Sequence, residues 1–175
     1  MPVFDENESM ATIEIATTAD AAARLDELLW VVLWQPLGLP RDVRRSFSLP
    51  GEGCELLALE KGQVVGGLVA LGTDDIEIEL RHLAVASQAQ GHGIGRALVA
   101  ELYRIAAAKK CRRIHTIARN TSADFFRALG FRTAPGHAPE HPAFLEHGIT
   151  FELMEKCVEQ GLQPSLVVVP DRRPR

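Results

Sequence analysis

The feature that most constrains this chain is a glycine-rich stretch, SQAQGHGIGRALVAEL (residues 87–102), that leads directly into a helical pattern. Gly91, Gly93 and Gly95 stand at alternate positions, and apolar residues with amphipathic spacing follow them. No Asp or Glu occurs from Ala86 to Ala100, although acidic residues are favoured where a helix begins because its first amides carry partial positive charge. The stretch therefore predicts that a negatively charged ligand binds where this helix begins.

Three phosphate-binding patterns compete for this loop. The dinucleotide-binding pattern GxGxxG requires a third glycine where Arg96 stands, and it follows the first strand of a βαβ unit. The P-loop requires Lys and then Ser or Thr after its last glycine, where this chain has Arg96 and Ala97. The third pattern, Q/R-x-x-G-x-G, is satisfied by Gln90, Gly93 and Gly95. We therefore predict a diphosphate site of the third kind.

The physical reason for this prediction is the exposed main chain of the loop. Glycine has no Cβ, so a bulky phosphate can approach the backbone, and successive N–H groups at a helix N-terminus point toward its oxygens. Arg96, in the first turn, opposes the helix dipole when no ligand is bound but complements a bound anion. The alternative is that the glycines only form a tight strand-to-helix connection and that Arg96 is a solvated surface residue.

Hydrophobic periodicity along the rest of the sequence predicts one mixed sheet with helices on both faces. Strands are expected at residues 12–17, 54–60, 64–71, 76–85, 112–118 and 149–158. Helices are expected at 21–34, 41–47 and 122–129, and after the glycine loop, where Leu98, Leu102 and Ile105 form a buried stripe. Residues 61–63 and 73–75 are predicted turns, and 134–144 a loop. Three antiparallel-type strands followed by a strand–helix–strand crossover place the chain in the α/β (α+β) class.

Composition limits the classes of function. The chain has 175 residues, enough for one domain with a substantial core; we assign residues 1–160 to it and regard the Pro- and Arg-rich segment 161–175 as a frayed tail. The net charge of −4 provides no broad cationic surface, so nucleic acid is not expected as a partner. The longest apolar run, residues 28–34, is too short to span a bilayer, and the N-terminus has no signal-peptide pattern. Three scattered cysteines without CxxC spacing favour a reducing, cytoplasmic location.

Two neighbouring segments connect the loop to a known family. ELRHLAV, residues 79–85, precedes the loop, and ARNTSADFFRALGF, residues 118–131, follows its helix. Together with the glycine loop, these segments resemble the linked motifs of the GNAT superfamily of acyl-CoA-dependent N-acetyltransferases. A weaker likeness to the closing strand of some bacterial members continues through residues 144–156, where Thr150 and Phe151 replace a Pro-His pair.

The resemblance implies a mixed, mostly antiparallel sheet of roughly six to seven strands, splayed at its centre and flanked by about four helices. The strand that ends at Val85 would diverge from the strand at 112–118, and its backbone would pair with the pantetheine arm of acetyl-CoA as an added strand does. Amides of the glycine loop would hold the pyrophosphate, and Asn120 with the helix after it would line the other side. The cofactor-binding residues expected on this basis are Leu83, Ala84, Val85, Gln90, Gly91, His92, Gly93, Ile94, Gly95, Arg96, Asn120 and Phe126.

The resemblance also implies direct attack of a bound amine on the acetyl thioester, without a covalent enzyme intermediate. An amine that arrives protonated requires a general base. Glu79 stands where the histone-acetylating branch of the superfamily has its catalytic Glu, counted back without gaps from Gln90, and Glu77 shares its strand face. The alternative is that these carboxylates only form a polar strand face. Histidine titrates near neutrality, so His82 and His115 are further candidates for the base.

The sequence identifies no residue that would protonate the departing thiolate. Relatives commonly have a Tyr directly after the Phe of the third motif, and here that pair is Phe125 and Phe126. Phe has no proton to donate, and the only tyrosine, Tyr103, lies in the preceding helix, where packing is the expected role. Water, another group or unassisted departure are the alternatives.

Functions of different classes stay open. The leading one is a cytoplasmic N-acetyltransferase that moves acetyl from acetyl-CoA to a primary amine of a small molecule or a protein. The second is a non-catalytic acyl-CoA-binding or sensing module, which the missing Tyr favours; a dinucleotide oxidoreductase is poorly supported because its glycine pattern is absent.

No metal is expected, since the spacing of His137, His141 and His147 fits no zinc motif. Trp30 and Trp34 are expected to pack or to line an acceptor pocket, and a homodimer is the oligomer considered.

Overall fold

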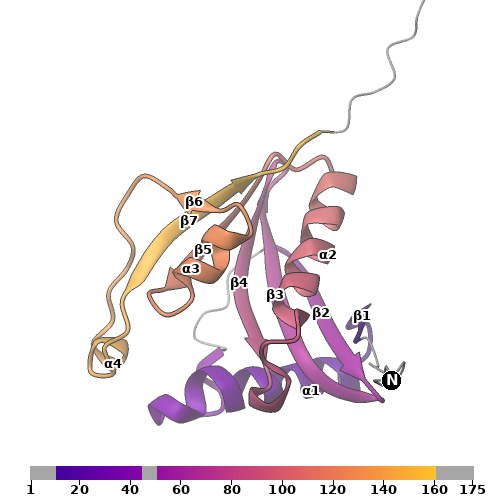
Figure 1. The fold of residues 1–175 in the computed structure, drawn as a ribbon, viewed down its shortest axis with the longest axis vertical. Coiled ribbons are helices and arrows are strands. Elements are labelled where there is room, and N and C mark those ends of the chain that lie inside the picture. Colours follow the sequence, from indigo (N-terminus) through magenta and orange to yellow (C-terminus); the bar gives the residue numbers. More distant parts are fainter. Residues whose placement is uncertain (1–10, 45–50, 161–175) are drawn as a thin grey trace, which may run out of the picture.

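Seven strands form one mixed sheet in the computed structural model, which describes residues 11–44 and 51–160 (Figure 1). The strands are β1 (Thr12–Ile15), β2 (Glu52–Glu60), β3 (Gln63–Asp74), β4 (Glu77–Val85), β5 (Arg113–Arg119), β6 (Arg132–Thr133) and β7 (Phe151–Cys157). Their order across the sheet is β1-β2-β3-β4-β5-β7-β6, and among these described pairs only β4–β5 is parallel. The structure confirms the mixed, mostly antiparallel sheet predicted from the sequence.

Helices cover both faces of this sheet. They are α1 (Ala19–Leu29), the π-helix η1 (Trp30–Trp34) and the 3-10 helix η2 (Gln35–Leu37) that continue it, the 3-10 turn η4 (Ser87–Ala89), α2 (Ile94–Ala108), α3 (Ala123–Ala128) and α4 (Pro142–Leu145). Thr18 begins α1 as its residue type predicts, because its hydroxyl accepts a hydrogen bond from Ala21 N (3.1 Å). No helix within residues 11–44 and 51–160 is long and apolar enough to cross a membrane.

Two predicted connections differ in the structure. β3 continues through most of the predicted turn at 73–75, and the chain reverses at Asp75 and Ile76, where Asp74 Oδ1 accepts a hydrogen bond from Ile76 N (2.8 Å). The predicted loop at 134–144 leads into α4, whose start is capped by His141 Nδ1 accepting from Ala143 N (3.2 Å). A one-turn helix and the two-residue strand β6 are too short to produce a recognisable period in the sequence.

The remaining boundaries agree more closely with the sequence predictions. The helix expected at 21–34 begins two residues earlier and changes to π geometry at Trp30. Of the helix expected at 41–47, residues 41–44 form a turn and a short 3-10 segment, and residues 45–47 lie outside the described residues. The tail at 161–175 also lies outside them.

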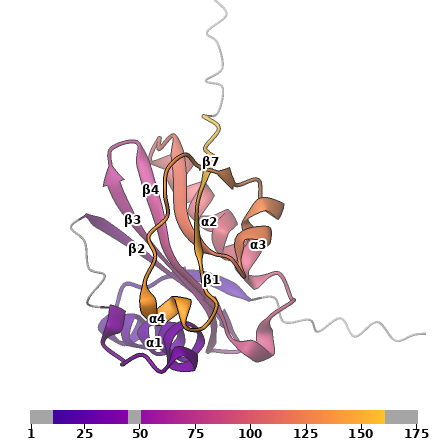
Figure 2. The same ribbon diagram turned by 90° about the vertical axis from the view of Figure 1, so that its left-hand side faces the viewer.

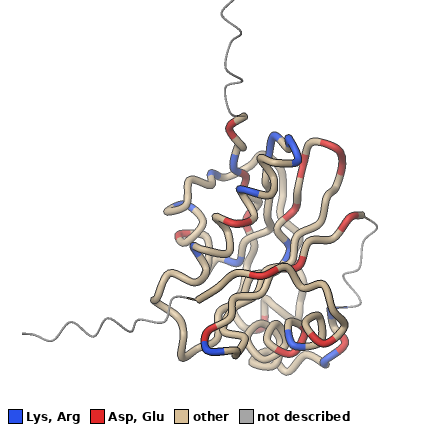
Figure 3. The backbone as a smooth tube through the Cα atoms, turned by 90° about the vertical axis from the view of Figure 1, so that its right-hand side faces the viewer, with Lys and Arg blue, Asp and Glu red and all other residues tan. Residues whose placement is uncertain are grey.

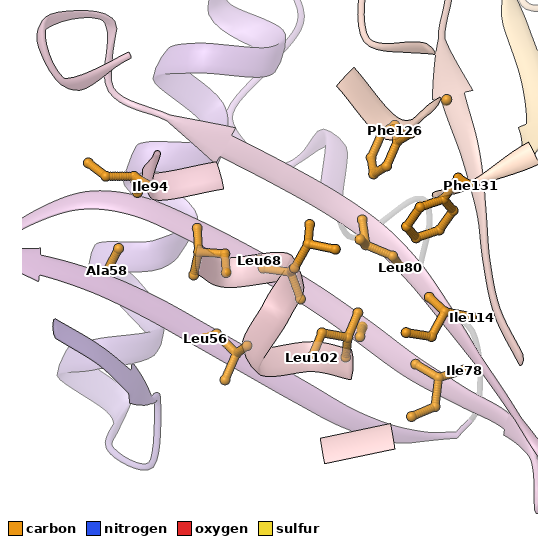
Figure 4. Close-up of a cluster of buried hydrophobic side chains, with 14 of the residues drawn as sticks. Leu56, Ala58, Leu68, Ile78, Leu80, Ile94, Leu102, Ile114, Phe126 and Phe131 are labelled. Atoms are coloured by element: carbon orange, nitrogen blue, oxygen red, sulfur yellow. The ribbon is translucent and has the colours of Figure 1, made fainter. Parts of the chain in front are cut away.

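Buried side chains form two clusters, one on each face of the sheet. Leu56, Leu68 and Leu80 point to the face covered by α2 and α3 (Figure 4). Leu57 and Val69, their neighbours along β2 and β3, point to the opposite face, which is covered by α1, η1 and α4. Successive strand residues point to opposite faces, so the continuous apolar runs of β2 and β3 supply both clusters.

Two adjacent glycines in β3 let helices on both faces approach the strand closely. A Cβ on Gly67 would lie 2.2 Å from Leu25 Cδ1 of α1, and a Cβ on Gly66 would lie 2.7 Å from Ile94 Cγ2 of α2. Leu25 is fully buried and Ile94 is 6% exposed, so neither side chain has free space to move into. The glycine pair thus sets how closely α1 and α2 pack on the sheet.

The sheet opens between β4 and β5. Their parallel register joins residues 77–80 to residues 113–116, whereas β4 continues to Val85 and β5 to Arg119. Figure 1 shows the two halves of the sheet converging at one end and spreading apart toward α1 and α4. Figure 2 shows α4 beside α1 at this open end, where Phe144 and Trp34 belong to the same buried cluster. The splayed centre expected from the family resemblance is therefore present.

A bulge in β4 accounts for this divergence. Val69 of β3 faces His82, and the next residue, Ala70, faces Leu80. Arg81 is therefore the one extra residue that β4 contains at this step of its register with β3. A bulge bends its strand and increases the local twist. The bulge lies where the β4–β5 pairing ends, so it turns the rest of β4 away from β5.

Adding one methyl group at the contact between α1 and β3 is expected to destabilise the fold. Gly67→Ala should lower the free energy of unfolding by about 1–3 kcal/mol, because an overpacked core must displace Leu25 or the strand. Gly53→Ala in β2 is the matched control: a Cβ there meets nothing within 4 Å, and the change should be neutral or stabilise by about 0.5–1 kcal/mol. Urea unfolding followed by circular dichroism measures both variants. Equal unfolding free energies would contradict the close approach of α1.

Candidate functional site

The diverging strands enclose a cavity of about 400 Å³. This volume lies in the range of small-molecule sites in proteins. Its walls are formed by Leu33 and Trp34 of η1, residues 79–83 of β4, residues 116–119 of β5, Ser122 and Phe126, residues 139–141, Phe144 of α4 and Phe151 of β7. Apolar walls thus surround a small set of charged side chains from both halves of the sheet.

One buried hydrogen bond closes the narrow end of the cavity. Thr116 Oγ1 donates to Leu80 O (2.8 Å), and Thr116 is 3% exposed. Beyond this point, within the described chain, β4 has no neighbouring strand on its β5 side. On that edge the main chain of residues 83–85, apart from Val85 O, which accepts a hydrogen bond from Gln90 Nε2 (3.0 Å), is therefore open to an extended ligand that pairs with it as an added strand does.

At the end of β4 the glycine loop exposes bare main chain. Gly91 and Gly93 both have a φ of 81°, in the left-handed region that favours glycine. A Cβ on either residue would meet no atom within 4 Å, and both residues are exposed. The space that side chains would fill is therefore open to a ligand.

The start of α2 provides hydrogen-bond donors and a positive potential. Its first intrahelical bond runs from Ala97 N to Gly93 O (3.0 Å), so the N–H groups of residues 94–96 have no acceptor within the helix. The first turn contains no acidic residue, and the side chain of Arg96 is exposed. Helix N-termini of this kind bind phosphate groups. The geometry fits the diphosphate site that the sequence predicts.

The third glycine and Gln90 have structural contacts of their own. A Cβ on Gly95 would lie 3.2 Å from Phe125 Cζ, so this glycine allows α3 to pack against the start of α2. Gln90 Nε2 donates a hydrogen bond to Val85 O (3.0 Å), which ties the loop to the end of β4. Packing of α3 against α2 thus explains the glycine at position 95. Beside Gly91 and Gly93, by contrast, no protein atom fills the space that a side chain would occupy.

The side chains of the other expected cofactor residues lie in different surroundings. Ala84 and Ile94 are buried in the two core clusters, whereas Leu83 lines the cavity. His92 Nδ1 lies 3.2 Å from Ala89 O, so its ring turns back onto the loop. Because the side chains of Ala84 and Ile94 are buried, these two residues can contact a ligand only through their main-chain atoms.

Asn120 and Phe126 lie on the β5 side of the opening. Asn120 Nδ2 donates to Gly148 O (3.2 Å), and its Oδ1 accepts from Thr150 N (3.3 Å), so its side chain links the end of β5 to the segment before β7. Phe126 is 4% exposed, packs edge-on against Phe131 and also lines the cavity. In the structure Asn120 supports the wall, and Phe126 forms part of it.

Glu79 is the predicted carboxylate that faces the cavity. Its Oε2 lies 3.9 Å from Arg81 Nη1, and both side chains are 14% exposed. Glu77 does not belong to the described cavity walls; it is bound to Arg113, and its Oε2 lies 3.8 Å from His115 Nε2. Because Glu79 lines the cavity and Glu77 does not, Glu79 is the better placed of the two for acid–base chemistry.

His82 lines the cavity as a neutral imidazole. Burial, followed by the positive charges of Arg44, Arg81 and Arg119, lowers the pKa of His82 to about 3. Its ring packs edge-on against Trp34, with centroids 5.1 Å apart. An imidazole that titrates so far below neutrality is a weak base, so the environment of His82 does not favour its use as the general base.

Tyr103 packs away from the cavity, as the sequence predicted. Its hydroxyl accepts a hydrogen bond from Glu159 N (2.9 Å), and Lys156 Nζ lies 4.9 Å from the centre of its ring. In the described ranges, no group of three or more His, Cys, Asp or Glu side chains is arranged to hold a metal ion. Of the three histidines weighed as metal ligands, His141 caps α4 and lines the cavity.

Arg119 and Phe144 belong to the cavity wall, although neither was predicted from the sequence as a site residue. Arg119 Nη2 donates to Leu33 O (2.9 Å), and its guanidinium carbon lies 5.5 Å from the centre of the Phe144 ring. Burial lowers the pKa of Arg119. Strand alternation places Arg119 on the same face of β5 as His115 and Ile117, and this signal was available in the sequence. Phe144 gave no such signal because its segment resembles a loop.

Charges of opposite sign are interspersed over the described surface. Figure 3 shows Lys and Arg positions alternating with Asp and Glu positions on the side of the molecule that it presents. Several are paired, such as Arg127 with Glu152 (2.7 Å) and Arg104 with Glu101 (2.6 Å).

Comparisons with known proteins lead to the family that the sequence motifs resemble. Residues 52–133 match the family model described as "acetyltransferase (GNAT) domain". An aminoglycoside 6'-N-acetyltransferase complexed with coenzyme A superposes with a TM-score of 0.66 at 16% identity, over 85% of this chain and 97% of that chain. ElaA of Escherichia coli gives 0.69 at 15% identity, over 84% and 99% of the two chains. The ribosomal-protein-S18-alanine N-acetyltransferase of Escherichia coli gives 0.66 at 16% identity, over 90% and 99%.

A bulky residue at position 93 should prevent binding of coenzyme A without unfolding the protein. Gly93→Leu fills the open space beside the helix start and blocks several charge-assisted hydrogen bonds, so affinity should fall by about 100-fold or more. Gly62→Leu is the matched control, since Gly62 also has a positive φ (77°) and a Cβ there meets nothing within 4 Å. Both variants carry the same kind of backbone strain. Calorimetric titration with coenzyme A measures the affinity; equal affinities in the two variants would refute the phosphate-loop assignment.

Proposed function

We propose that the chain is an N-acetyltransferase of the GNAT superfamily that transfers acetyl from acetyl-CoA to a primary amine by direct attack. In this reaction the amine nitrogen forms a bond to the thioester carbonyl carbon and loses a proton. The carbon–sulfur bond breaks, and coenzyme A leaves as the thiolate. We assign residues 1–160 to the acetyltransferase domain and residues 161–175 to a tail.

The observation that carries this proposal is the unpaired edge of β4, which leads into an exposed helix start. An extended pantetheine arm can pair with residues 83–85, and the diphosphate then reaches the loop, where Gly91 and Gly93 leave room for it. Arg96 and the first amides of α2 supply positive potential to the phosphates. The thioester end is directed into the cavity, where Leu83 and Glu79 form part of the wall.

Glu79 is assigned the role of general base. Its side chain lines the cavity, with Oε2 3.9 Å from Arg81 Nη1. Amines are largely protonated near neutrality, so a proton must be removed before the nitrogen can attack, directly or through one water. His82, the other candidate base in the wall, has its pKa lowered to about 3.

The departing thiolate is assigned no protein acid. Phe126 occupies the position of the usual Tyr and has no proton to donate. Thiols titrate at roughly 8.5, so a thiolate is a stable enough leaving group to depart with water as the only proton source. The same residue favours the second candidate function, a non-catalytic acyl-CoA-binding or sensing module.

The fold alone does not name the acceptor. The similar structures include an aminoglycoside acetyltransferase and one that acts on an alanine of ribosomal protein S18, so one fold serves small molecules and proteins. For location we propose the cytoplasm, because Cys54, Cys111 and Cys157 are all free thiols. The cavity volume favours a small-molecule acceptor over a protein.

Release of free coenzyme A thiol in the presence of an amine panel tests the proposed reaction. The full chain with acetyl-CoA should release thiol in proportion to at least one primary amine, with the N-acetyl product detected by mass spectrometry. Calorimetric titration with coenzyme A on the same sample reports binding independently. Binding without turnover of any amine would reject the enzyme and support the binding module.

Replacing the proposed base should slow turnover most at low pH. Glu79→Gln should reduce kcat by about 100-fold near pH 6.5, and the loss should shrink as pH rises because more of the amine is then already deprotonated. Glu77→Gln is the matched control on the same strand face, outside the described cavity walls and already bound to Arg113. A pH–rate profile of Glu79→Gln that parallels the wild-type profile would remove Glu79 from this role.

A further inference from the structure

We propose that the acceptor amine also carries a carboxylate, and that Arg119 binds this carboxylate at the open end of the cavity. The inference rests on the acetyl transfer proposed above and specifies its substrate class: a small amine of the amino-acid type.

Among the described residues, Arg119 differs from the neighbouring arginines because no carboxylate forms an ion pair with it. Arg113, Arg127 and Arg132 all form ion pairs with Asp or Glu side chains. Within the described chain Arg119 forms no ion pair, and its hydrogen bond goes to the main-chain carbonyl of Leu33 (2.9 Å). A guanidinium has five N–H donors, so most of those of Arg119 are left for a ligand.

The surroundings of Arg119 make a bound anion favourable. Its guanidinium is held from one side by Leu33 O and packs near the Phe144 ring, so its position is fixed before a ligand arrives. Burial lowers the pKa of Arg119, because a charge removed from water without a counter-ion is costly. A ligand carboxylate would supply the missing counter-ion in the bidentate geometry that guanidinium groups favour.

The other charges of the cavity are already balanced or lie at its edge. Glu79 and Arg81 face each other at 3.9 Å. Glu140 also lines the cavity, but its side chain is exposed to solvent. Arg119 is therefore the unbalanced cation of the half-buried wall. A single positive charge matches a carboxylate, which carries one negative charge, better than a phosphate, which carries nearly two near neutrality.

Aromatic walls next to Arg119 define the rest of the acceptor. Trp34, Phe144 and Phe151 line the same cavity. They favour an apolar body between the carboxylate and solvent, since a polar one would lose its hydration without gaining partners. Arg119 lies four residues past His115, the register partner of Glu79, so Arg119 and Glu79 start roughly 13 Å apart along the strands, and both side chains reach into the same cavity.

The test compares amines that differ only in the carboxylate. Phenylalanine and phenethylamine share the aromatic body and the amine, and the wild-type protein should show a KM at least about tenfold lower for phenylalanine. Arg119→Gln should raise the KM for phenylalanine by about 10- to 100-fold and leave that for phenethylamine within twofold. Arg119→Lys should restore part of the loss. Unchanged acetyl-CoA affinity in these variants reports an intact fold.

Arg104→Gln is the matched control for the loss of a positive charge. Arg104 is exposed on α2 and paired with Glu101, so this variant should leave both KM values unchanged. The inference is overturned if phenethylamine is used as well as phenylalanine, if Arg119→Gln raises both KM values equally, or if O-phosphoethanolamine is preferred to carboxylates. Preference for diamines that is lost in Glu140→Gln would also overturn it.

A binding measurement separates this inference from the proposed reaction. N-acetylphenylalanine should bind to the protein saturated with coenzyme A more tightly than the neutral N-acetylphenethylamine, and Arg119→Gln should abolish the difference. If this holds while no amine is turned over, the carboxylate site stands and the proposed reaction fails. If amines are turned over but the two products bind equally, the reaction stands and the carboxylate site is refuted.

Discussion

The site depends on one interruption of β-pairing. β4 and β5 share a short parallel ladder that ends at Leu80 and Thr116, where a buried hydrogen bond from Thr116 Oγ1 to Leu80 O closes it. The extra residue at Arg81 then bends β4 away. A continuous ladder would satisfy the main chain of both strands and leave neither a cavity nor a free edge. Because the ladder stops, residues 83–85 have no neighbouring strand on this side within the described chain, and an extended ligand has an edge to pair with.

Electrostatics divides the opening into two regions. The outer region, at the glycine loop, has no acidic residue in the first turn of α2 and presents main-chain N–H groups to solvent. The inner region holds paired and unpaired charges behind apolar walls: Glu79 with Arg81, a neutral His82, and Arg119 with a main-chain partner. A highly charged diphosphate suits the first region, and a smaller acceptor with one or two charges suits the second. The two regions are joined by the free edge of β4.

Local patterns in the sequence indicated the open helix start of the outer region. The missing acids and the glycine spacing indicated an anion site at a helix start, and Gly91 and Gly93 do have open space beside them. In the sequence Gly95 looked equivalent to Gly91 and Gly93. In the structure, however, a side chain at position 95 would crowd Phe125, and this contact becomes visible only once α3 is packed against α2. The glycine pair at positions 66 and 67 likewise became meaningful once α1 and α2 were seen on opposite faces of β3.

The inner region was harder to predict because it depends on register and on short elements. The bulge at Arg81 exists only in the pairing of β4 with β3, and one-turn α4, which brings Phe144 to the wall, has no period of its own. Glu77 and Glu79 share a strand face, yet a cation on the neighbouring strand binds Glu77. Asn120 was expected beside a cofactor, and the structure uses its side chain to join two chain segments. Contacts between residues far apart in the sequence determine the partners of these side chains.

The most direct measurement of the central claim is a residue-resolved titration of the backbone amides with coenzyme A. In isotope-labelled protein, coenzyme A should shift the amide resonances of residues 91–96 and 83–85 together, whereas pantetheine, which lacks the diphosphate, should shift only those of 83–85. Saturable binding of coenzyme A that leaves the amides of residues 91–96 unmoved would contradict the account.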